Sequence, residues 1–312
     1  HVPGWGNPTE DPHTTESTAV YGQATYELNE ANRVIGGLRM NDDSKTFTGT
    51  SIEDWSDDSM TYKAAYERDM DEDTMVYASY STGIRTVGAN DARTVARGAP
   101  ALYDNEEVTS MELGYKTVMN DNTMVLNVAA YSNEYADVKA QLFAVACNDT
   151  SDTDAVACAA ASTSTTFEYY QNGGDSSTTG LEVELQYAPD DKLNVTANLA
   201  YTDAEFDSGY TVGNNLINPL AGLGNYQGRQ TGNTFNMGGM KPAFSPELAA
   251  SVTASYSYEL FGGTMTPSIL FNWLDDYYTF DVNLPENLQE SHTKTDLRVS
   301  WTNGDGVTLE GF

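Results

Sequence analysis

Few residues in this sequence are of the types that carry out covalent chemistry. Histidine, the commonest acid–base residue, occurs only at His1, His13 and His292. The sequence contains no H-E-x-x-H pattern, no nucleophile elbow and no Walker loop. The glycine-rich stretch at 222–228, GLGNYQG, lacks the following helical pattern that a phosphate cradle requires. The residues therefore predict a protein that is not an enzyme, with no catalytic residue, no cofactor and no catalytic metal.

The two cysteines, Cys147 and Cys158, lie close together in a polar stretch rich in Ala, Ser, Thr and Asp. This spacing predicts a local disulfide, which stabilises a fold by roughly 2–3 kcal/mol in the chain-entropy model. Such a bond implies an oxidising compartment. The alternative is a pair of free thiols, and a metal site is disfavoured because no histidine lies nearby.

Residues suited to non-covalent recognition lie mainly in irregular stretches. Aromatic residues there are candidates for a ligand-contacting surface, unless they pack within loops or at a membrane border: Trp55, Tyr103, Tyr169, Tyr170, Tyr210, Tyr226, Tyr277 and Tyr278. Arginines are candidates for binding an anionic group such as a carboxylate, unless they pair with neighbouring acids: Arg85, Arg93, Arg97 and Arg229. Acidic side chains that suit a structural Ca²⁺, unless they are simply solvated, are Asp275, Asp276 and Asp281.

The charge balance excludes several partners. Asp and Glu number 46 against 15 Lys and Arg, which gives a net charge of −31. Phosphate backbones repel such a surface, so the sequence predicts no binding to nucleic acid. It also predicts no basic attraction to an anionic membrane surface. The acidity fits a highly solvated surface or one that attracts cations.

A period of two is the main structural signal. In residues 180–201, GLEVELQYAPDDKLNVTANLAY, apolar and polar side chains alternate on both sides of the turn at Pro189–Lys192. Because successive strand residues face opposite sides, this stretch is predicted to be a hairpin with one apolar and one polar face. The same alternation recurs in further segments: 20–28, 111–116, 247–258 and 296–302. At 73–85 and 122–136 both faces carry apolar residues, so their orientation stays open.

The lengths of the connections follow a rule. We expect about twelve strands, near 17–29, 32–48, 59–69, 73–85, 107–119, 122–142, 166–188, 193–206, 245–259, 264–279, 292–303 and 307–312. Short turns between them alternate with long connections, at 49–58, 86–106, 143–165, 207–244 and 280–291. A soluble β-sandwich has no reason to keep this rule, whereas an outer-membrane barrel has short periplasmic turns and longer outer loops.

The apolar face is predicted to contact lipid. Residues 193–201, tilted by about 40°, cover roughly 20–23 Å of the membrane normal, close to the apolar band of such barrels. Aromatic residues cluster near the short turns, as in an interfacial girdle: Tyr26, Tyr66, Tyr115, Tyr187, Tyr258 and Trp301. The opposite face carries charges such as Glu182 and Glu184, which a water-filled lumen tolerates and a dry core does not. The predicted fold is an all-β transmembrane antiparallel β-barrel.

Several segments resemble the C-terminal barrel half of TonB-dependent outer-membrane receptors. STAVYGQATYELNEANRVIGGLRMNDDSKTF resembles a strand pair of that family ending in G-x-R-x-x-x-x-x-K, and MVYASYSTGIRTVG resembles its Y-A-S-Y-S-x-G-F/I-R strand. EEVTSMELGYKTVMNDNTMVLNVAAYSNEYADVKAQ resembles its E-x-x-x-x-E-L-G-x-K stretch with the N-x-A-x-F/Y strand that follows. LRVSW followed by GDGVTLEGF resembles the approach to its final strands. The resemblance covers most of residues 16–312, except the long loops.

This resemblance implies about twelve strands of a barrel of about 22. Residues 1–312 would form a partial barrel domain that begins in an extracellular loop and ends within a strand, with the plug domain and TonB box outside this sequence. The resemblance further implies a place in the bacterial outer membrane and contact with its lipid bilayer. It implies uptake of a scarce small-molecule ligand, such as a ferric siderophore or another metal chelate, energised by the TonB complex through the plug.

Two alternative functions stay open at this point. A passive porin or substrate-specific channel would share the barrel, and a plug domain encoded upstream of His1 would separate it from a receptor. A soluble or surface-bound β-protein, such as an adhesin, would instead cover the apolar face with a second sheet or with helices.

Overall fold

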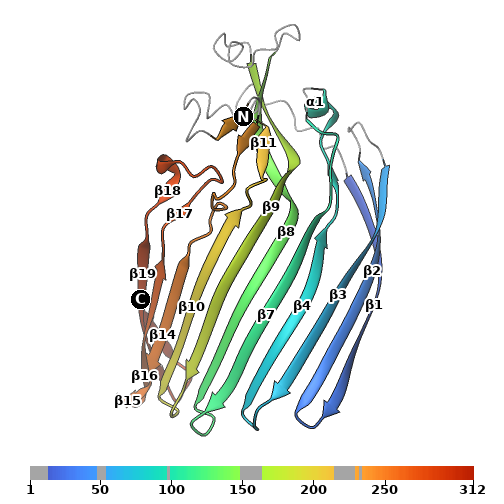
Figure 1. The fold of residues 1–312 in the computed structure, drawn as a ribbon. Helices are drawn as coiled ribbons and strands as arrows, with labels where there is room; N and C mark the ends of the chain where they lie inside the picture. The colour runs from blue at the N-terminus through green and yellow to red at the C-terminus, as the bar shows by residue number, and fades with distance from the viewer. Residues whose placement is uncertain (1–12, 48–53, 97–98, 148–163, 214–228, 232–233) are drawn as a thin grey trace.

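A computed structural model of the chain describes residues 13–47, 54–96, 99–147, 164–213, 229–231 and 234–312. Its main element is one antiparallel sheet of 13 strands. The strand order is β1-β2-β3-β4-β7-β8-β9-β10-β14-β16-β19-β20, with β15 paired to β16 off this path. Figure 1 shows these strands as long, tilted neighbours that follow one another around a curved wall. The predicted all-β antiparallel fold is confirmed, with the sheet open between β1 and β20 in the described residues.

The strands of the main sheet are β1 (His13–Asn29), β2 (Asn32–Phe47), β3 (Asp54–Asp69), β4 (Thr74–Arg85), β7 (Glu106–Met119), β8 (Met124–Cys147), β9 (Ser164–Tyr187), β10 (Leu193–Phe206), β14 (Leu248–Tyr256), β15 (Tyr258–Leu260), β16 (Gly263–Leu274), β19 (His292–Asn303) and β20 (Thr308–Gly311). The described parts of the long connections hold β5 (Gly88–Ala89), α1 (Ala92–Val95), β6 (Leu102–Tyr103), β11 (Thr211–Gly213), β12 (Gln230–Thr231), β13 (Thr234–Asn236), β17 (Tyr277–Tyr278), the 3₁₀ turn Pro285–Asn287 and β18 (Leu288–Gln289).

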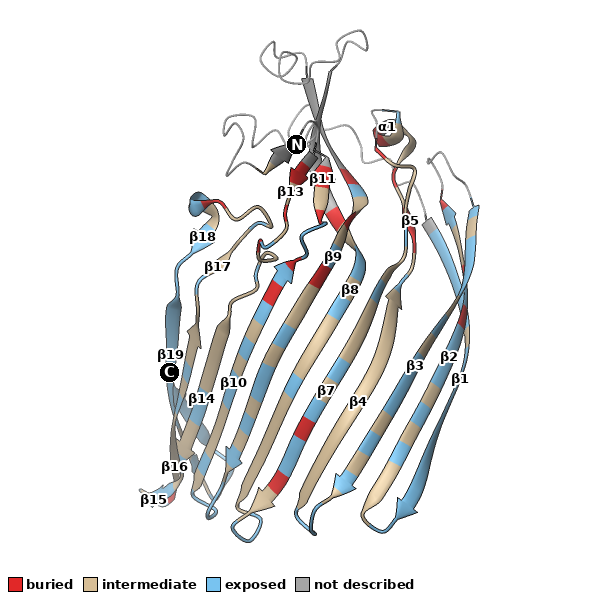
Figure 2. Ribbon diagram, in the orientation of Figure 1, coloured by how far each residue is buried: buried red, intermediate tan, exposed pale blue. Residues whose placement is uncertain are grey.

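The short and long connections lie at opposite ends of the sheet, which we call the short-turn end and the long-loop end (Figure 1). Figure 2 places most of the buried positions toward the long-loop end. A hydrophobic cluster lies there, made of Ala140, Phe206, Tyr210, Val212, Phe235, Met237, Met240 and Leu284. The long connections are thus packed structures in their own right. No helix in the described residues is long and apolar enough to cross a membrane.

One predicted strand is divided in two. The sequence predicts a single strand at 245–259, but the structure ends β14 at Tyr256 and begins β15 at Tyr258. Pro267 of β16 lies opposite the break, between the pairs Ser255–Ser268 and Tyr258–Met265. Proline has no backbone N–H, so it cannot complete the ladder at this point.

Strand register gathers the apolar side chains on one face of the sheet. Directly paired residues share a face, and one row of pairs runs through nine strands: Tyr26, Val34, Tyr66, Ala78, Leu113, Ala130, Leu181, Tyr201 and Leu248. No described part of the chain covers the apolar side chains of this face: Val20 is 74% exposed, Leu113 64% and Leu297 63%. An apolar surface of this extent is expected to contact hydrocarbon.

The opposite face is polar across the same strands. One row of pairs runs from β8 to β19 through Asn127, Glu184, Asn198, Ser251, Asn272 and Lys294. Asn127 donates a hydrogen bond to Glu184 at 3.2 Å, and Asn198 donates one to Ser251 at 3.1 Å. These groups need water or polar partners, as the lumen of a barrel provides.

Charged side chains mark where the apolar band ends toward the long loops. Val20, Met40 and Met60 are paired across β1, β2 and β3, and each is the last large apolar residue on this face of its strand toward the long loops. Two positions closer to the long loops, Asp42 of β2 and Asp58 of β3 are strand partners, and both lie on this same face. Residues of these strands beyond this border lie outside the apolar band.

Register also settles the orientation of the segment at 73–85. Tyr77 lies on the polar face, opposite Gly114, and its hydroxyl donates to Glu112 Oε1 at 2.6 Å. The ring lies over the glycine, because a Cβ built at Gly114 would be 1.9 Å from Tyr77 Cε1. The Lys116 ammonium is 5.4 Å from the same ring centroid.

Replacing Leu199 by Arg tests the lipid-facing assignment. Leu199 lies on the apolar face between Val183 and Ala250, so an arginine there should cost about 2–4 kcal/mol of folding free energy. Urea titration of the full-length protein in vesicles measures this cost. Glu184→Gln, on the polar face of the adjoining strand, is the control and should be tolerated. Equal effects of both variants would contradict the assignment.

Gly114→Val is expected to destabilise the sheet by about 1–3 kcal/mol, because the new side chain overlaps the Tyr77 ring. The same urea titration measures the loss. Gly22→Val is the matched control, since a Cβ at Gly22 meets nothing within 4 Å. A Gly114→Val protein as stable as Gly22→Val would show that the Tyr77 ring is free to move.

Candidate functional site

Three basic side chains converge at the long-loop end of the polar face. Lys45 comes from the end of β2, Arg85 from the end of β4 and Lys139 from the upper part of β8. Lys45 lies beyond the border marked by Asp42 and Asp58, and Arg85 and Lys139 lie where β4 and β8 reach the long-loop end. Their proximity is notable in a chain of net charge −31 with only 15 basic residues.

Both lysines bind the carbonyl groups where the chain leaves β4. Lys45 Nζ donates to the Val87 carbonyl oxygen at 2.5 Å. Lys139 Nζ donates to the Arg85 carbonyl oxygen at 2.9 Å and also to the Thr86 carbonyl oxygen. These contacts place two ammonium groups beside the arginine at one turn of the chain.

Acidic groups balance part of this charge. Arg85 forms an ion pair with Glu106, its directly paired neighbour on β7. The same carboxylate accepts the backbone N–H of Lys139 at 2.9 Å. The two ammonium groups, in contrast, take backbone carbonyl oxygens and no carboxylate in the described contacts. Their positive charge is therefore neutralised less than that of Arg85 and can attract an incoming anion.

Aromatic rings complete this group. The Tyr103 and Tyr170 ring centroids are 5.4 Å apart. Lys139 Nζ lies 5.4 Å from the Tyr103 centroid, and Lys45 Nζ lies 6.0 Å from the Trp55 ring. We call Lys45, Trp55, Arg85, Tyr103, Lys139 and Tyr170 the rim cluster. Its cations and ring faces suit an anionic ligand that carries planar groups.

Burial changes the titration of the rim cluster. Desolvation, together with the positive charges of Arg85 and Lys45, lowers the pKa of Lys139 to about 8. Desolvation also lowers the pKa of Lys45, opposed by the carboxylate of Asp43. The pKa of Tyr103 is raised by burial and by Tyr170. Bringing an anion next to Lys139 would favour its charged form.

Asparagine side chains fix the connection at 86–105 over the sheet. Asn90, which is 4% exposed, donates to the Tyr170 carbonyl oxygen and accepts the Tyr170 N–H, both at 2.7 Å. Asn105 accepts the Val87 N–H at 2.7 Å and donates to Asp57 at 3.0 Å. Asn172 accepts the Asp104 N–H at 2.6 Å. The connection is thereby tied to β3 on one side and β9 on the other.

The structure brings together some of the residues that the sequence analysis proposed for ligand contact. Trp55, Arg85, Tyr103 and Tyr170 belong to the rim cluster, and their role in binding stays a prediction. Lys45 and Lys139 were not predicted. Lys45 is the last residue of the G-x-R-x-x-x-x-x-K pattern, but the pattern assigns it no role, and no pattern marks Lys139. The rarity of basic residues in this sequence was a further signal, but the contacts of both lysines depend on strand register.

Other predicted contact residues have structural partners instead. Tyr169 is 1% exposed and Tyr210 is 2% exposed, with the Tyr210 ring 4.2 Å from Phe206. Arg229 donates to the carbonyl oxygens of Asn236 and Gly238, at 3.2 and 2.7 Å. These two tyrosines are packed inside the long-loop end, and their role in ligand contact stays a prediction.

The remaining predicted residues divide between two groups. Tyr277 and Tyr278 form β17, away from the rim cluster, and Tyr277 packs on Phe244 at 5.9 Å. Several others lie outside the described residues or side chains, so their predicted roles stay predictions: Arg93, Arg97, Cys147, Cys158 and Tyr226.

Two of the three acids proposed for Ca²⁺ accept hydrogen bonds from backbone N–H groups. Asp275 accepts the N–H of Asp276 at 2.9 Å, and Asp281 accepts the N–H of Ala243 at 2.8 Å. Among the residues that the structure describes, no three His, Cys, Asp or Glu side chains are grouped to hold a metal ion.

Comparison with known proteins identifies the family. The family model described as "TonB dependent receptor-like, beta-barrel" matches residues 2–312. The comparison with curated protein sequences found no match.

Solved structures show the same fold. The ferric yersiniabactin uptake receptor FyuA from Yersinia pestis aligns with a TM-score of 0.69 and 16% identity over 96% of this chain and 40% of its own. The siderophore receptor PiuA from Acinetobacter baumannii aligns with a TM-score of 0.67 and 21% identity over 96% of this chain and 38% of its own. The copper transporter OprC aligns with a TM-score of 0.65 and 14% identity over 96% of this chain and 42% of its own.

The chain therefore spans about 40% of the length of such receptors. The predicted apolar outer face, polar inner face and alternation of turns and loops agree with a wall of their barrel. The chain belongs to the TonB-dependent receptor family, as part of the β-barrel with which these transport proteins cross the outer membrane of Gram-negative bacteria.

Proposed function

We propose that the receptor containing this chain takes up a scarce, anionic metal chelate, such as a ferric siderophore, and that TonB energises its passage. The observation that carries this proposal is the rim cluster. It gathers Lys45, Arg85 and Lys139 on the lumenal side of the long-loop end, within a protein that is otherwise strongly acidic.

The chemistry of the rim cluster fits such a ligand. Carboxylate, catecholate and hydroxamate groups of metal chelates are oxygen donors with negative charge, which ammonium and guanidinium groups bind. The rings of Trp55, Tyr103 and Tyr170 offer planar faces to the organic part of the chelate. The related solved structures include a ferric yersiniabactin uptake receptor, a siderophore receptor and a copper transporter, which supports metal uptake as the class of function.

The asparagine contacts explain how a loop site keeps its shape. The connection at 86–105 bears Tyr103 and follows directly on Arg85, and Asn90, Asn105 and Asn172 fix it to neighbouring strands. A site held in this way loses little conformational entropy when it binds a ligand.

Uptake by intact cells tests the energised transport. Cells that express the full-length receptor, in a strain lacking its own siderophore receptors, should accumulate radiolabelled iron from a matching ferric siderophore under iron limitation. Accumulation should fall to background when the tonB gene is deleted, because passage past the plug requires energy. Accumulation that is unchanged without TonB would instead identify a passive channel.

The pH dependence of binding tests the rim cluster. Lys139 has a pKa of about 8, so it carries a positive charge below this pH and loses it as pH rises. The Kd for an anionic chelate should therefore increase several-fold between about pH 7 and 9. Isothermal titration with the purified full-length receptor measures this profile.

Lys139→Arg supplies the control, because arginine keeps its charge over this range. The variant should bind with a flatter pH profile, while Arg298→Gln, a lumenal variant near the short-turn end, should keep the profile of the unaltered protein. Identical profiles in the Lys139→Arg and unaltered receptors would show that Lys139 does not contact the bound anion.

A further inference from the structure

The apolar face carries a groove of about 780 Å³ across β2, β3, β4, β7 and β8. Its floor is the backbone of one row of paired residues whose side chains point to the polar face: Ile35, Ala65, Ser79, Glu112 and Tyr131. Its walls are the side chains of the two adjoining rows: Val34, Tyr66, Ala78, Leu113 and Ala130 on one side, and Ala64, Tyr80, Met111 and Ser132 on the other. The groove therefore opens toward hydrocarbon.

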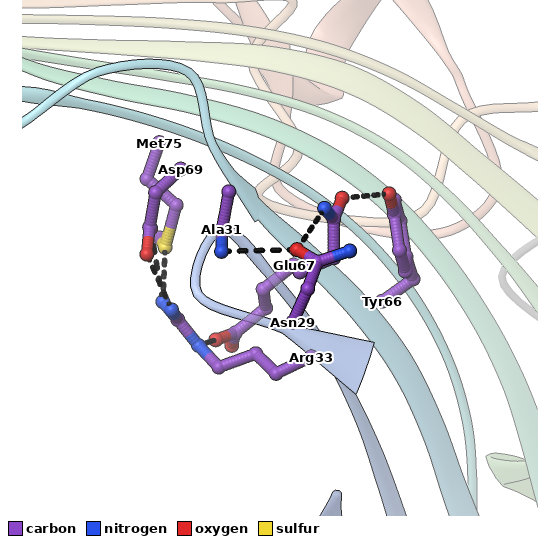
Figure 3. Close-up of polar contacts among 8 residues, drawn as sticks. Asn29, Ala31, Arg33, Tyr66, Glu67, Asp69 and Met75 are labelled. Atoms are coloured by element: carbon purple, nitrogen blue, oxygen red, sulfur yellow. Dashed lines mark hydrogen bonds and ion pairs between the residues drawn. The ribbon is translucent and has the colours of Figure 1, made fainter. Parts of the chain in front are cut away.

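The length and chemistry of the groove fit a fatty acyl chain. It crosses five neighbouring strands, or about 19 Å at the usual strand spacing, which is comparable with an extended acyl chain. The Tyr66 hydroxyl is directed away from the groove, since it donates to Asn32 Oδ1 at 2.5 Å (Figure 3). Carbon atoms thus dominate the walls.

Arg68 lies just beyond the groove toward the short-turn end. It follows Tyr66 by two residues on β3 and is exposed on the apolar face, where it pairs with Asn32 and Val76. The other basic residues that the structure places in strands of the apolar band face the polar side: Arg33, Arg39, Lys63, Lys116, Lys294 and Arg298. A lone arginine at this border requires an explanation.

Arg33, on the neighbouring strand β2, differs from Arg68 in having acidic partners. Arg33 forms ion pairs with Glu67 at 2.5 Å and Asp69 at 2.7 Å on the polar face (Figure 3). Arg68 has no ion pair in the described part of the chain. An unpaired guanidinium at the edge of hydrocarbon is placed to bind the phosphate of a lipid.

The two short turns next to Arg68 contain acidic residues. Glu30 lies in the β1–β2 turn, and Asp71, Glu72 and Asp73 lie in the β3–β4 turn. These carboxylates repel a headgroup with net negative charge and attract an ammonium group. The charges together select a zwitterionic headgroup that carries a phosphate and a primary ammonium.

We propose that these strands form a binding site for one phosphatidylethanolamine molecule of the leaflet on the short-turn side. The groove takes one acyl chain, Arg68 binds the phosphate, and the acidic turns attract the ammonium group. This inference requires the lipid-facing barrel wall and is independent of the solute that the receptor transports.

Native mass spectrometry of the full-length receptor tests the headgroup contacts. The receptor is delipidated and titrated with palmitoyl-oleoyl phosphatidylethanolamine, and one bound lipid is expected at low lipid excess. Arg68→Gln should weaken this binding about tenfold or more, as loss of a charge-assisted hydrogen bond implies. Lys63→Gln, which removes a charge from the polar face of the same strand, should leave it unchanged. Equal binding by both variants, or equal binding of phosphatidylglycerol, would overturn the headgroup assignment.

A second variant tests the groove itself. Ala78→Leu fills the groove with an apolar side chain that lipid tolerates, so the barrel should still assemble and the bound phosphatidylethanolamine should be lost. Ala254→Leu, on the same face of β14 and outside the groove, is the control. Unchanged lipid binding by folded Ala78→Leu receptor, or a mass showing a second receptor copy in place of lipid, would overturn the proposal.

Discussion

The structure depends on one constraint: in hydrocarbon, every backbone N–H and C=O must find its partner within the protein. Long antiparallel strands, each paired on both sides, meet this requirement from β2 to β19. The cost of an unpaired group explains why the ladder is interrupted where Pro267 lacks an N–H. The same ladder fixes register, and register fixes which side chains meet lipid and which meet water.

Division into two faces accounts for the distribution of charge. The chain has a net charge of −31. Acids such as Glu112 and Glu184 occupy the lumenal face, and others lie in the short turns, in the loops or, like Asp42 and Asp58, beyond the border of the apolar band. Basic residues are few, so their positions carry information. Lys45, Arg85 and Lys139 meet at the lumenal rim, whereas Arg68 is the one basic residue that the described strands of the apolar band place on the lipid side. The first group suits an anionic solute, and the second position suits a lipid phosphate.

Much of the fold could be predicted from the sequence, because alternation is a local property. The hairpin at 180–201 and the alternation of short and long connections agree with the structure. The candidate site was predicted less well. Trp55, Arg85, Tyr103 and Tyr170 were proposed for their residue type and loop position, and so were Tyr169 and Tyr210, which are buried. Residue type alone does not separate a tyrosine that packs a loop from one that lines a lumen.

The sequence by itself determined the strands, their two chemical faces and the family, since each depends on neighbours along the chain. Tertiary structure decided which residues from distant strands meet. Tyr77 faces the lumen because Gly114, 37 positions away, leaves room for its ring. Lys139 joins Lys45 and Arg85 because the register of β2 to β8 brings their ends together. The register of two strands depends on the combined energy of many residue pairs, so no short segment of the sequence specifies it.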